Sequence, residues 1–235
     1  YDILYQQILN YNPHTFLNRE QFAIIILDAL SMREGSLLKV ALKNKGYIIK
    51  NYRYGFSTIP SDTTTFSKRH FNKVGPSAIK KGFNEPFYYD HIKQGTIEFD
   101  HLNEKASRRL LLWSTYPDEL IHKSAVPPYE AYFKTQELLF KILDRVDADN
   151  FIIFGDHGYL ITNPIWQVSS KDKKFLDRIF KAERSKKISE IDKKQIEKIK
   201  DIPKYLAQYF LTNEFIFMKG RYFWAVRGHR SNIIH

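Results

Sequence analysis

The chain has 235 residues, of which 43% are hydrophobic and 15% aromatic, and it contains no cysteine. This composition excludes a wholly disordered chain and suits one domain with room for an appended subdomain. No apolar run approaches the roughly 18 residues that span a bilayer, and no signal-peptide pattern precedes the first strand. Disulfides and thiolate metal sites are excluded, so we expect a cytoplasmic protein whose metal ligands are oxygen and imidazole.

The chain is basic, with 37 Lys and Arg residues against 26 Asp and Glu residues and a net charge of +11. A positive balance favours polyanionic partners such as nucleic acid, nucleotides or anionic surfaces. Lysine-rich proteins are also basic for reasons of genome composition. Charge alone therefore leaves nucleic-acid contact open.

Helical and extended patterns alternate in the first quarter of the chain. Apolar residues at helical spacing predict a short helix over residues 1–17. Residues 22–27 form a continuous apolar run, typical of a central strand buried on both faces, and Asp28 ends it. A helix over 31–45 and an extended segment over 47–57 follow. Strand, helix and strand predict a right-handed parallel crossover.

A proline-led turn rich in hydroxyl groups follows at residues 59–65. Such a turn can place a helix N-terminus beside a hydroxyl nucleophile, here Thr63, and an incoming phosphate. An ordinary capped helix start has the same pattern, and the turn alone favours that interpretation. Residues 75–100 are aromatic and rich in loop formers, and they predict no clear element.

Residues 109–114 predict another buried strand, which runs into Asp118 and His122. The two residues are four apart, so one helical turn would place both on one face, where they could hold one ion. An N-cap aspartate with an unrelated histidine is the alternative. An amphipathic helix is predicted over residues 129–146.

A short apolar run at residues 151–154 is stopped by Gly155, and Asp156 and His157 follow directly. This order places a carboxylate and an imidazole at the tip of a strand, where open α/β sheets bind ligands. Aspartate and histidine are a ligand pair that suits zinc or a similar divalent cation.

Two other Asp-His pairs test how much this pattern means. Asp90-His91 and Asp100-His101 lie in aromatic segments without a clear strand pattern. Only the pair after residues 151–154 follows a clean apolar run and has glycine on both sides. We therefore expect it alone to be a metal site.

The last third of the chain begins with a charged stretch. Residues 171–200 contain twelve Lys or Arg against six Asp or Glu, with apolar residues at helical spacing. One or two solvated amphipathic helices explain the pattern, and a basic arm that holds a polyanion is the alternative. A helix over 203–211 and a hairpin formed by 214–218 and 222–226 are predicted next, and His229 follows them.

Five motifs recur at predicted strand ends or turns in a fixed order. They are Asp after the first strand, Pro-Ser-x-Thr, Asp-x-x-x-His, strand-Asp-His-Gly and a late Gly-His. This order resembles the alkaline phosphatase superfamily. Within it, the motifs D-A-L-S-M-R-E at 28–34, I-P-S-D-T at 59–63 and G-D-H-G are most similar to PglZ domains. The resemblance spans residues 22–230.

The resemblance implies an α/β fold, an alkaline-phosphatase-like three-layer sandwich with a central, mostly parallel sheet and helices on both faces. Residues 1–235 would form a single domain, with a basic helical insertion at residues 168–212.

By the same resemblance, Thr63 would be the nucleophile, and two divalent ions would complete the site. Zinc suits the ligands best and manganese is possible. One ion would be held by Asp28, Thr63, Asp156 and His157, and the other by Asp118, His122 and His229.

Two positions depart from a simple match. The nucleophile is assigned to Thr63 because that of the family follows proline by three positions. A match shifted by one residue would assign it to Thr64. The late motif of PglZ domains usually continues into glycine or serine and an acidic residue, whereas Arg230 and Ser231 follow His229 here.

The resemblance implies a metal-dependent phosphodiesterase that acts on nucleotides or oligonucleotides through a phosphothreonine intermediate. It also implies a prokaryotic or archaeal cytoplasm, and a role such as phage defence. A phosphomonoesterase of the same superfamily is one alternative. A non-catalytic module that binds nucleic acid or assembles a complex is another. We expect no membrane partner, and the sequence does not indicate an oligomeric state.

Overall fold

The computed structural model divides the chain into two compact units, Tyr1–Gly158 and Tyr159–His235. No helix among the described residues is long and apolar enough to cross a membrane. The described residues are 22–55, 57–84, 87–97, 109–122, 126–161, 166–181, 183, 185–200, 205–208, 214–218, 222–223 and 233–234.

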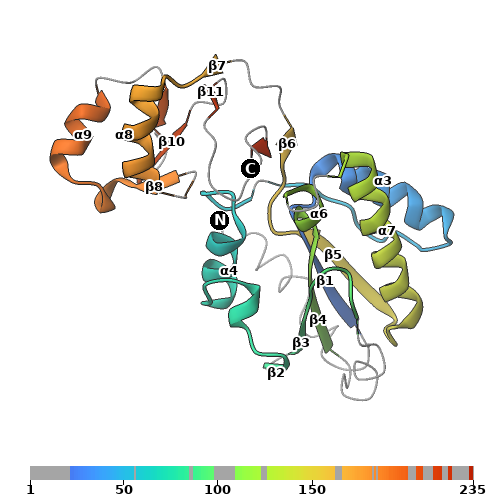
Figure 1. The fold of residues 1–235 in the computed structure, drawn as a ribbon. Coiled ribbons are helices and arrows are strands. Elements are labelled where there is room, and N and C mark those ends of the chain that lie inside the picture. The colour runs from blue at the N-terminus through green and yellow to red at the C-terminus, as the bar shows by residue number, and fades with distance from the viewer. Residues whose placement is uncertain are drawn as a thin grey trace. The chain divides into compact units, whose positions relative to one another are not determined.

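The first unit is built on a five-stranded sheet with the order β2-β3-β4-β1-β5 (Figure 1). Four of these strands, β3, β4, β1 and β5, are parallel, and β2 runs antiparallel to β3 at the edge. The strands are β1 (Phe22–Asp28), β2 (Gly82–Asn84), β3 (Phe87–Ile92), β4 (Arg109–Pro117) and β5 (Asn150–Gly155). The predicted α/β class with a mostly parallel central sheet is confirmed.

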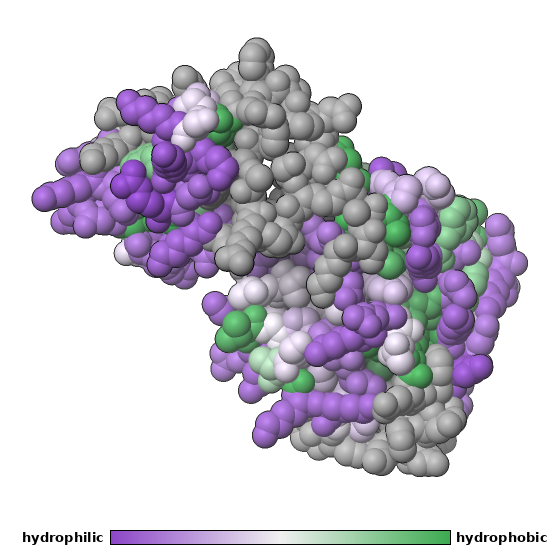
Figure 2. All heavy atoms as spheres, in the orientation of Figure 1, coloured by the Kyte–Doolittle hydropathy of each residue, from purple (hydrophilic) through white to green (hydrophobic). Residues whose placement is uncertain are grey.

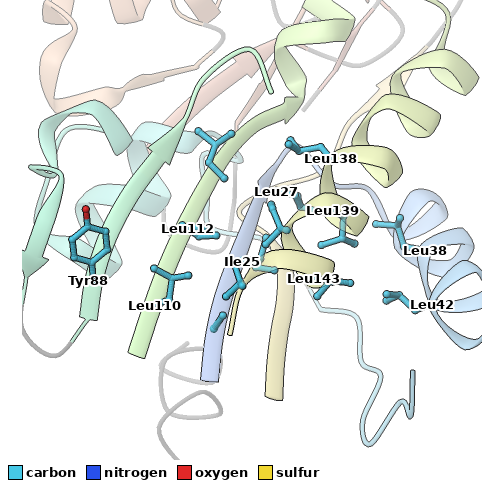
Figure 3. Packing of buried hydrophobic residues seen from close by; sticks show 14 residues of the cluster. Ile25, Leu27, Leu38, Leu42, Tyr88, Leu110, Leu112, Leu138, Leu139 and Leu143 are labelled. Carbon is cyan, nitrogen blue, oxygen red and sulfur yellow. The ribbon is translucent and has the colours of Figure 1, made fainter. Parts of the chain in front are cut away.

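Helical segments cover both faces of this sheet, because side chains of the central strands alternate between the faces. Ile25 and Leu27 of β1 pack with Leu38 of α3 and with α7 on one face (Figure 3). On the other face, the Phe66 ring of α4 packs edge-on against the Trp113 ring, with 5.7 Å between the ring centroids. This layering is compatible with a three-layer sandwich. The segments are α3 (Met32–Asn44), α4 (Thr63–Phe71), η1 (Pro76–Ala78), α6 (Asp118–His122) and α7 (Pro128–Arg145).

Capping residues fix where the two helices nearest the candidate site begin. The Ser31 side chain caps α3 by accepting from the backbone N–H of Glu34. The Asp62 side chain caps α4 by accepting from the N–H of Thr65 at 2.7 Å. Thr63 is therefore the first residue of α4.

The predicted strand over residues 47–57 is wrong, because none of its described residues forms a strand. The central strand β1 already pairs with β4 and β5, so β1 cannot receive this segment. Two side-chain contacts link the segment to β5. Lys50 Nζ lies 2.9 Å from Asn150 Oδ1, and the Tyr47 ring packs edge-on against the Phe151 ring. The predicted crossover from 22–27 into 47–57 is therefore wrong as well.

The other predicted elements of the first unit agree with the structure within a few residues. The helix predicted over residues 1–17 lies outside the described residues. The structure confirms three predicted strands, at 22–27, 109–114 and 151–154. It also confirms the two helices predicted at 31–45 and 129–146.

In the second unit, the described residues form three small sheets. The largest is antiparallel with the order β8-β10-β9, and the others pair β11 with β7 and β12 with β6. Its elements are β6 (Leu160–Ile161), β7 (Trp166–Gln167), α8 (Ser170–Phe180), β8 (Ser185–Lys187), η2 (Ile188–Glu190), α9 (Lys193–Lys200), β9 (Leu206–Gln208), β10 (Phe215–Met218), β11 (Tyr222–Phe223) and β12 (Ile233–Ile234).

The amphipathic helices predicted within 171–200 are present as α8 and α9. The helix predicted over 203–211 is wrong where the structure describes it, because β9 occupies its middle and pairs with β10. The predicted hairpin is also wrong, since β10 pairs with β8 and β9 whereas β11 pairs with β7. The insertion predicted at 168–212 falls within the second unit, and its boundaries remain a prediction.

Candidate metal site

Two neighbouring parallel strands bring the candidate ligands together. Asp28 is the last residue of β1, and Asp156 and His157 directly follow β5. Leu27 lies opposite Gly155 in the ladder between these strands. Because both strands run in the same direction, the residues that follow them emerge at one edge of the sheet.

The backbone around this edge is closely packed. A Cβ atom on Gly155 would lie 2.7 Å from the carbonyl oxygen of Leu30, so only glycine allows the end of β5 to approach the residues after β1. Ala29 has a φ of 61°, and its N–H donates to Asp156 Oδ1 at 3.0 Å. The N–H of His157 donates to the same oxygen at 2.9 Å. These contacts fix the Asp156 carboxylate and leave Oδ2 facing the site.

Helix α4 adds a hydroxyl to the cluster. Thr63 Oγ1 donates to Asp28 Oδ1 at 3.0 Å and also lies 3.0 Å from His157 Nε2. His157 Nδ1 lies 3.1 Å from the carbonyl oxygen of Gly158. Since a carbonyl only accepts, Nδ1 carries a proton and Nε2 faces the carboxylates, as in metal-binding histidines.

The site is buried, and its charged groups shift one another's pKa values. Asp156 is 1% exposed and His157 is 5% exposed. Burial, with the charge of Asp156, raises the pKa of Asp28 to about 8. Burial also raises the pKa of Asp156. For His157, burial lowers the pKa, but the two carboxylates outweigh it and raise the pKa to about 10. A divalent cation would offset the cost of burying two carboxylates.

Among the residues that the structure describes, one group of three can hold a metal ion. Asp28, Asp156 and His157 each offer one ligand atom, and these atoms lie within 4.8 Å of one another. Asp156 Oδ2 is buried and has no hydrogen-bond partner among the described residues. The nearest described cationic group is His157 Nε2 at 3.8 Å, beyond hydrogen-bond distance, so a bound cation would satisfy this buried oxygen better. The donors fit a divalent metal ion.

The predicted second pair lies at the same edge of the sheet. Asp118 is the first and His122 the last residue of α6, which directly follows β4. Strand β4 is the other parallel neighbour of β1. His122 Nε2 lies 3.3 Å from Asp118 Oδ1, so the spacing does place both side chains on one face. After burial and Asp156, the charge of Asp118 also contributes to the raised pKa of Asp28. The third predicted ligand of this ion, His229, lies outside the described residues.

The hydroxyls beside Thr63 have different surroundings. Thr64 is exposed, and Thr65 Oγ1 donates to the capping carboxylate of Asp62 at 3.1 Å. Of the three consecutive threonines, Thr63 is the one that contacts Asp28 and His157.

Asp90 and His91 lie on the parallel strand β3, which was not predicted from the sequence. Asp90 is buried and pairs with Lys81, with 3.4 Å between Oδ2 and Nζ. His91 Nδ1 lies 3.3 Å from Ser77 Oγ, and burial lowers the pKa of His91 to about 4. The aromatic run at 87–89 was the available strand signal. The pair Asp100-His101 lies outside the described residues.

The chain was compared with protein-family models, with curated proteins and with solved structures, and none of them matches it. The interpretation of the site therefore depends on its own geometry and chemistry.

Proposed function

We propose that this chain is a metal-dependent phosphohydrolase in which Thr63 is the nucleophile. One observation carries the proposal: Thr63 Oγ1 lies 3.0 Å from Asp28 Oδ1 and 3.0 Å from His157 Nε2, beside the three residues that can hold a metal ion. A hydroxyl, a base and a cation site in mutual contact are the components of nucleophilic phosphoryl transfer.

In the proposed reaction, Thr63 Oγ1 attacks phosphorus and the bond from phosphorus to the leaving oxygen breaks. Asp28 Oδ1 is within reach of the hydroxyl proton, whereas the lone pair of His157 Nε2 would be taken by the metal ion. A bound divalent ion would lower the pKa of the hydroxyl and offset charge on the phosphoryl oxygens. Water then cleaves the phosphothreonine ester, which returns the hydroxyl and releases the phosphate product.

The position of Thr63 on its helix favours an anionic substrate. It is the first residue of α4, where backbone N–H groups point away from the helix and attract negative charge. Thr63 is preferred over Thr64 as the nucleophile because Thr64 is exposed.

We extend the proposal to a second ion held by Asp118, His122 and His229. Asp118 and His122 are in contact at 3.3 Å on the neighbouring strand end, and the charge of Asp118 acts on Asp28. Zinc is the proposed metal and manganese the alternative, because all seven ligands are oxygen or imidazole donors.

The proposed fold is the alkaline-phosphatase-like sandwich, and the proposed relationship is to PglZ domains. Its support is the order of the motifs along the chain together with their positions at the ends of β1, β4 and β5. The net charge of +11 favours phosphodiesters of the nucleotide or oligonucleotide type over small monoesters. From the resemblance we further propose a role in phage defence in a prokaryotic or archaeal cytoplasm.

Hydrolysis of bis-nitrophenyl phosphate by the zinc-loaded chain tests the proposal, with nitrophenyl phosphate as the monoester comparison. Thr63→Ala removes the attacking oxygen, so we expect kcat to fall at least about a hundred-fold. The matched control is Thr64→Ala, which should change kcat by less than about twofold because the exposed side chain lies outside the cluster.

Three outcomes would contradict the account. Hydrolysis that survives Thr63→Ala would rule out the proposed nucleophile. A loss confined to Thr64→Ala would move the role by one residue. A metal-loaded chain that hydrolyses neither ester would favour the non-catalytic module.

A further inference from the structure

The second unit contains a small module, residues 168–218, whose order of elements is informative. Along the chain come α8, β8, η2, α9, β9 and β10, and the sheet has the order β8-β10-β9. The first strand therefore pairs with the last, and two helical segments lie between the first and second strands. Winged helix-turn-helix modules have this order of helices and strands. Here the first helix of the turn is reduced to η2, and two residues separate it from α9.

One hydrophobic core joins these elements. Its buried residues are Leu176, Ile179, Phe180, Ile191, Leu206 and Ile216. Ile188 of η2 and Ile196 of α9 are partly buried against it. Ile196 attaches α9 to the core, and Lys193 and Lys194 in the first turn of the helix are exposed. Within the module, α8 lies beside β8 (Figure 1).

Lys193 and Lys194 of α9 carry exposed positive charge, whereas two other lysines of the module, Lys173 and Lys186, are engaged in ion pairs. Lys173 pairs with Asp177 at 2.9 Å, and Lys186 pairs with both Glu183 and Glu190. By contrast, neither ammonium group of Lys193 and Lys194 has an ion pair with any described residue.

Acidic residues near α9 offset only part of this charge. The Asp192 carboxylate accepts from the backbone N–H of Lys194 at 2.7 Å and so acts as a helix cap. Glu197 is exposed on the helix. Residues 185–200 nevertheless contain six lysines and three acidic residues. Figure 2 shows that the viewed face of the module is strongly hydrophilic.

We propose that this module binds double-stranded DNA, with α9 entering the major groove and Lys193 and Lys194 contacting phosphates. The major groove of B-form DNA admits an α-helix, and the second helix of a helix-turn-helix lies there. The A-form groove of duplex RNA is too deep and narrow for side chains to read. This inference does not depend on hydrolysis at Thr63.

Fluorescence anisotropy tests the inference with the full chain and a labelled DNA duplex of about 20 base pairs, in EDTA so that no metal-dependent cleavage occurs. The experiment covers salt concentrations from about 50 to 200 mM. We expect Lys193→Ala/Lys194→Ala to weaken binding on the order of tenfold and to reduce the log–log salt slope by about 2, since two phosphate contacts are lost.

The matched control is Lys134→Ala/Lys141→Ala on α7. It removes the same charge, but each of these lysines pairs with a glutamate on its own helix. We expect the control to bind DNA nearly as tightly as the unsubstituted chain. Lys193→Arg/Lys194→Arg keeps the charge and should retain affinity, and thermal unfolding of each variant checks that the module is folded.

Four results would overturn the inference. They are no binding of the unsubstituted chain to the DNA duplex, equal loss in the α9 and α7 variants, loss with the arginine variant in a folded protein, or duplex RNA binding as tightly as DNA. Because the anisotropy is measured in EDTA, it reports binding without hydrolysis. Failure of the DNA-binding module is therefore distinguishable from failure of the proposed hydrolysis at Thr63.

Discussion

Gly155 shows how a residue without reactive groups positions the candidate metal site. A Cβ atom there would meet the Leu30 carbonyl oxygen at 2.7 Å and Leu30 Cβ at 2.9 Å. Both atoms belong to the segment that follows Asp28, and the next residue after Gly155 is the ligand Asp156. Space at this glycine therefore sets the separation between two ligands.

Gly155→Ala should push the two strand ends apart and weaken the site. We expect a loss of about 1–3 kcal/mol in the free energy of unfolding, as for other overpacked positions, and weaker zinc binding. Urea unfolding and zinc titration measure the two effects. Gly55→Ala is the control, because no atom lies within 4 Å of a Cβ built there. Equal stability and zinc affinity in both variants would refute the packing argument.

At the residue scale, the sequence alone was enough to select Asp28, Asp156 and His157, because each follows an apolar run that ends abruptly. Such a run predicts a buried strand, and the polar residue after it marks the strand end. The contact from Ala29 to Asp156 could not be predicted in this way. It depends on a backbone conformation, with a φ of 61°, that alanine rarely adopts.

At the scale of elements, helix α3 depends on one buried face. Leu38 is 3% exposed and packs into the core shared with β1 and α7, whereas Leu37 is 47% exposed. Leu38→Ala should lower the free energy of unfolding by about 2–5 kcal/mol, since it removes buried methyl groups and leaves a cavity.

Leu37→Ala serves as the matched control on the same helix, and we expect it to change stability by less than about 0.5 kcal/mol. Urea unfolding monitored by circular dichroism compares the two. Similar losses in both variants would mean that α3 does not pack on the sheet through the face described.

The elements that were predicted wrongly all depend on strand pairing with residues outside the segment. The extended segment 47–57 has a strand pattern, but β1 already pairs with β4 and β5. Residues 203–211 resemble a helix start after proline, yet β9 pairs with β10 further along the chain. The local pattern indicates whether a segment can form a helix or a strand. Residues outside the segment decide which strand, if any, it pairs with.

At the scale of the whole molecule, the site links stability to pH. In the metal-free protein, the pKa of Asp28 is raised from 3.8 to about 8 and that of His157 from 6.5 to about 10. The folded state therefore holds protons that the unfolded chain has already lost. Between the unfolded and folded pKa values, the folded state binds more protons, so stability falls as pH rises.

We therefore expect the urea midpoint of the metal-free chain in EDTA to decrease from about pH 5 to about pH 8. Asp28→Asn cannot titrate, so this variant should lose less stability over the same range. Parallel urea titrations at several pH values measure the difference. A midpoint that rises through this window, or one that falls equally in the variant, would contradict the described protonation of Asp28.

Zinc binding by the full chain, measured by equilibrium dialysis with metal analysis, tests the site most directly. We expect the unsubstituted chain to bind zinc and Asp156→Asn to lower the affinity at least about tenfold, because a buried carboxylate ligand is lost. The control Asp149→Asn removes an exposed carboxylate and should bind zinc as the unsubstituted chain does. Zinc binding that is absent, or that is the same in both variants, would contradict a metal site at Asp28, Asp156 and His157.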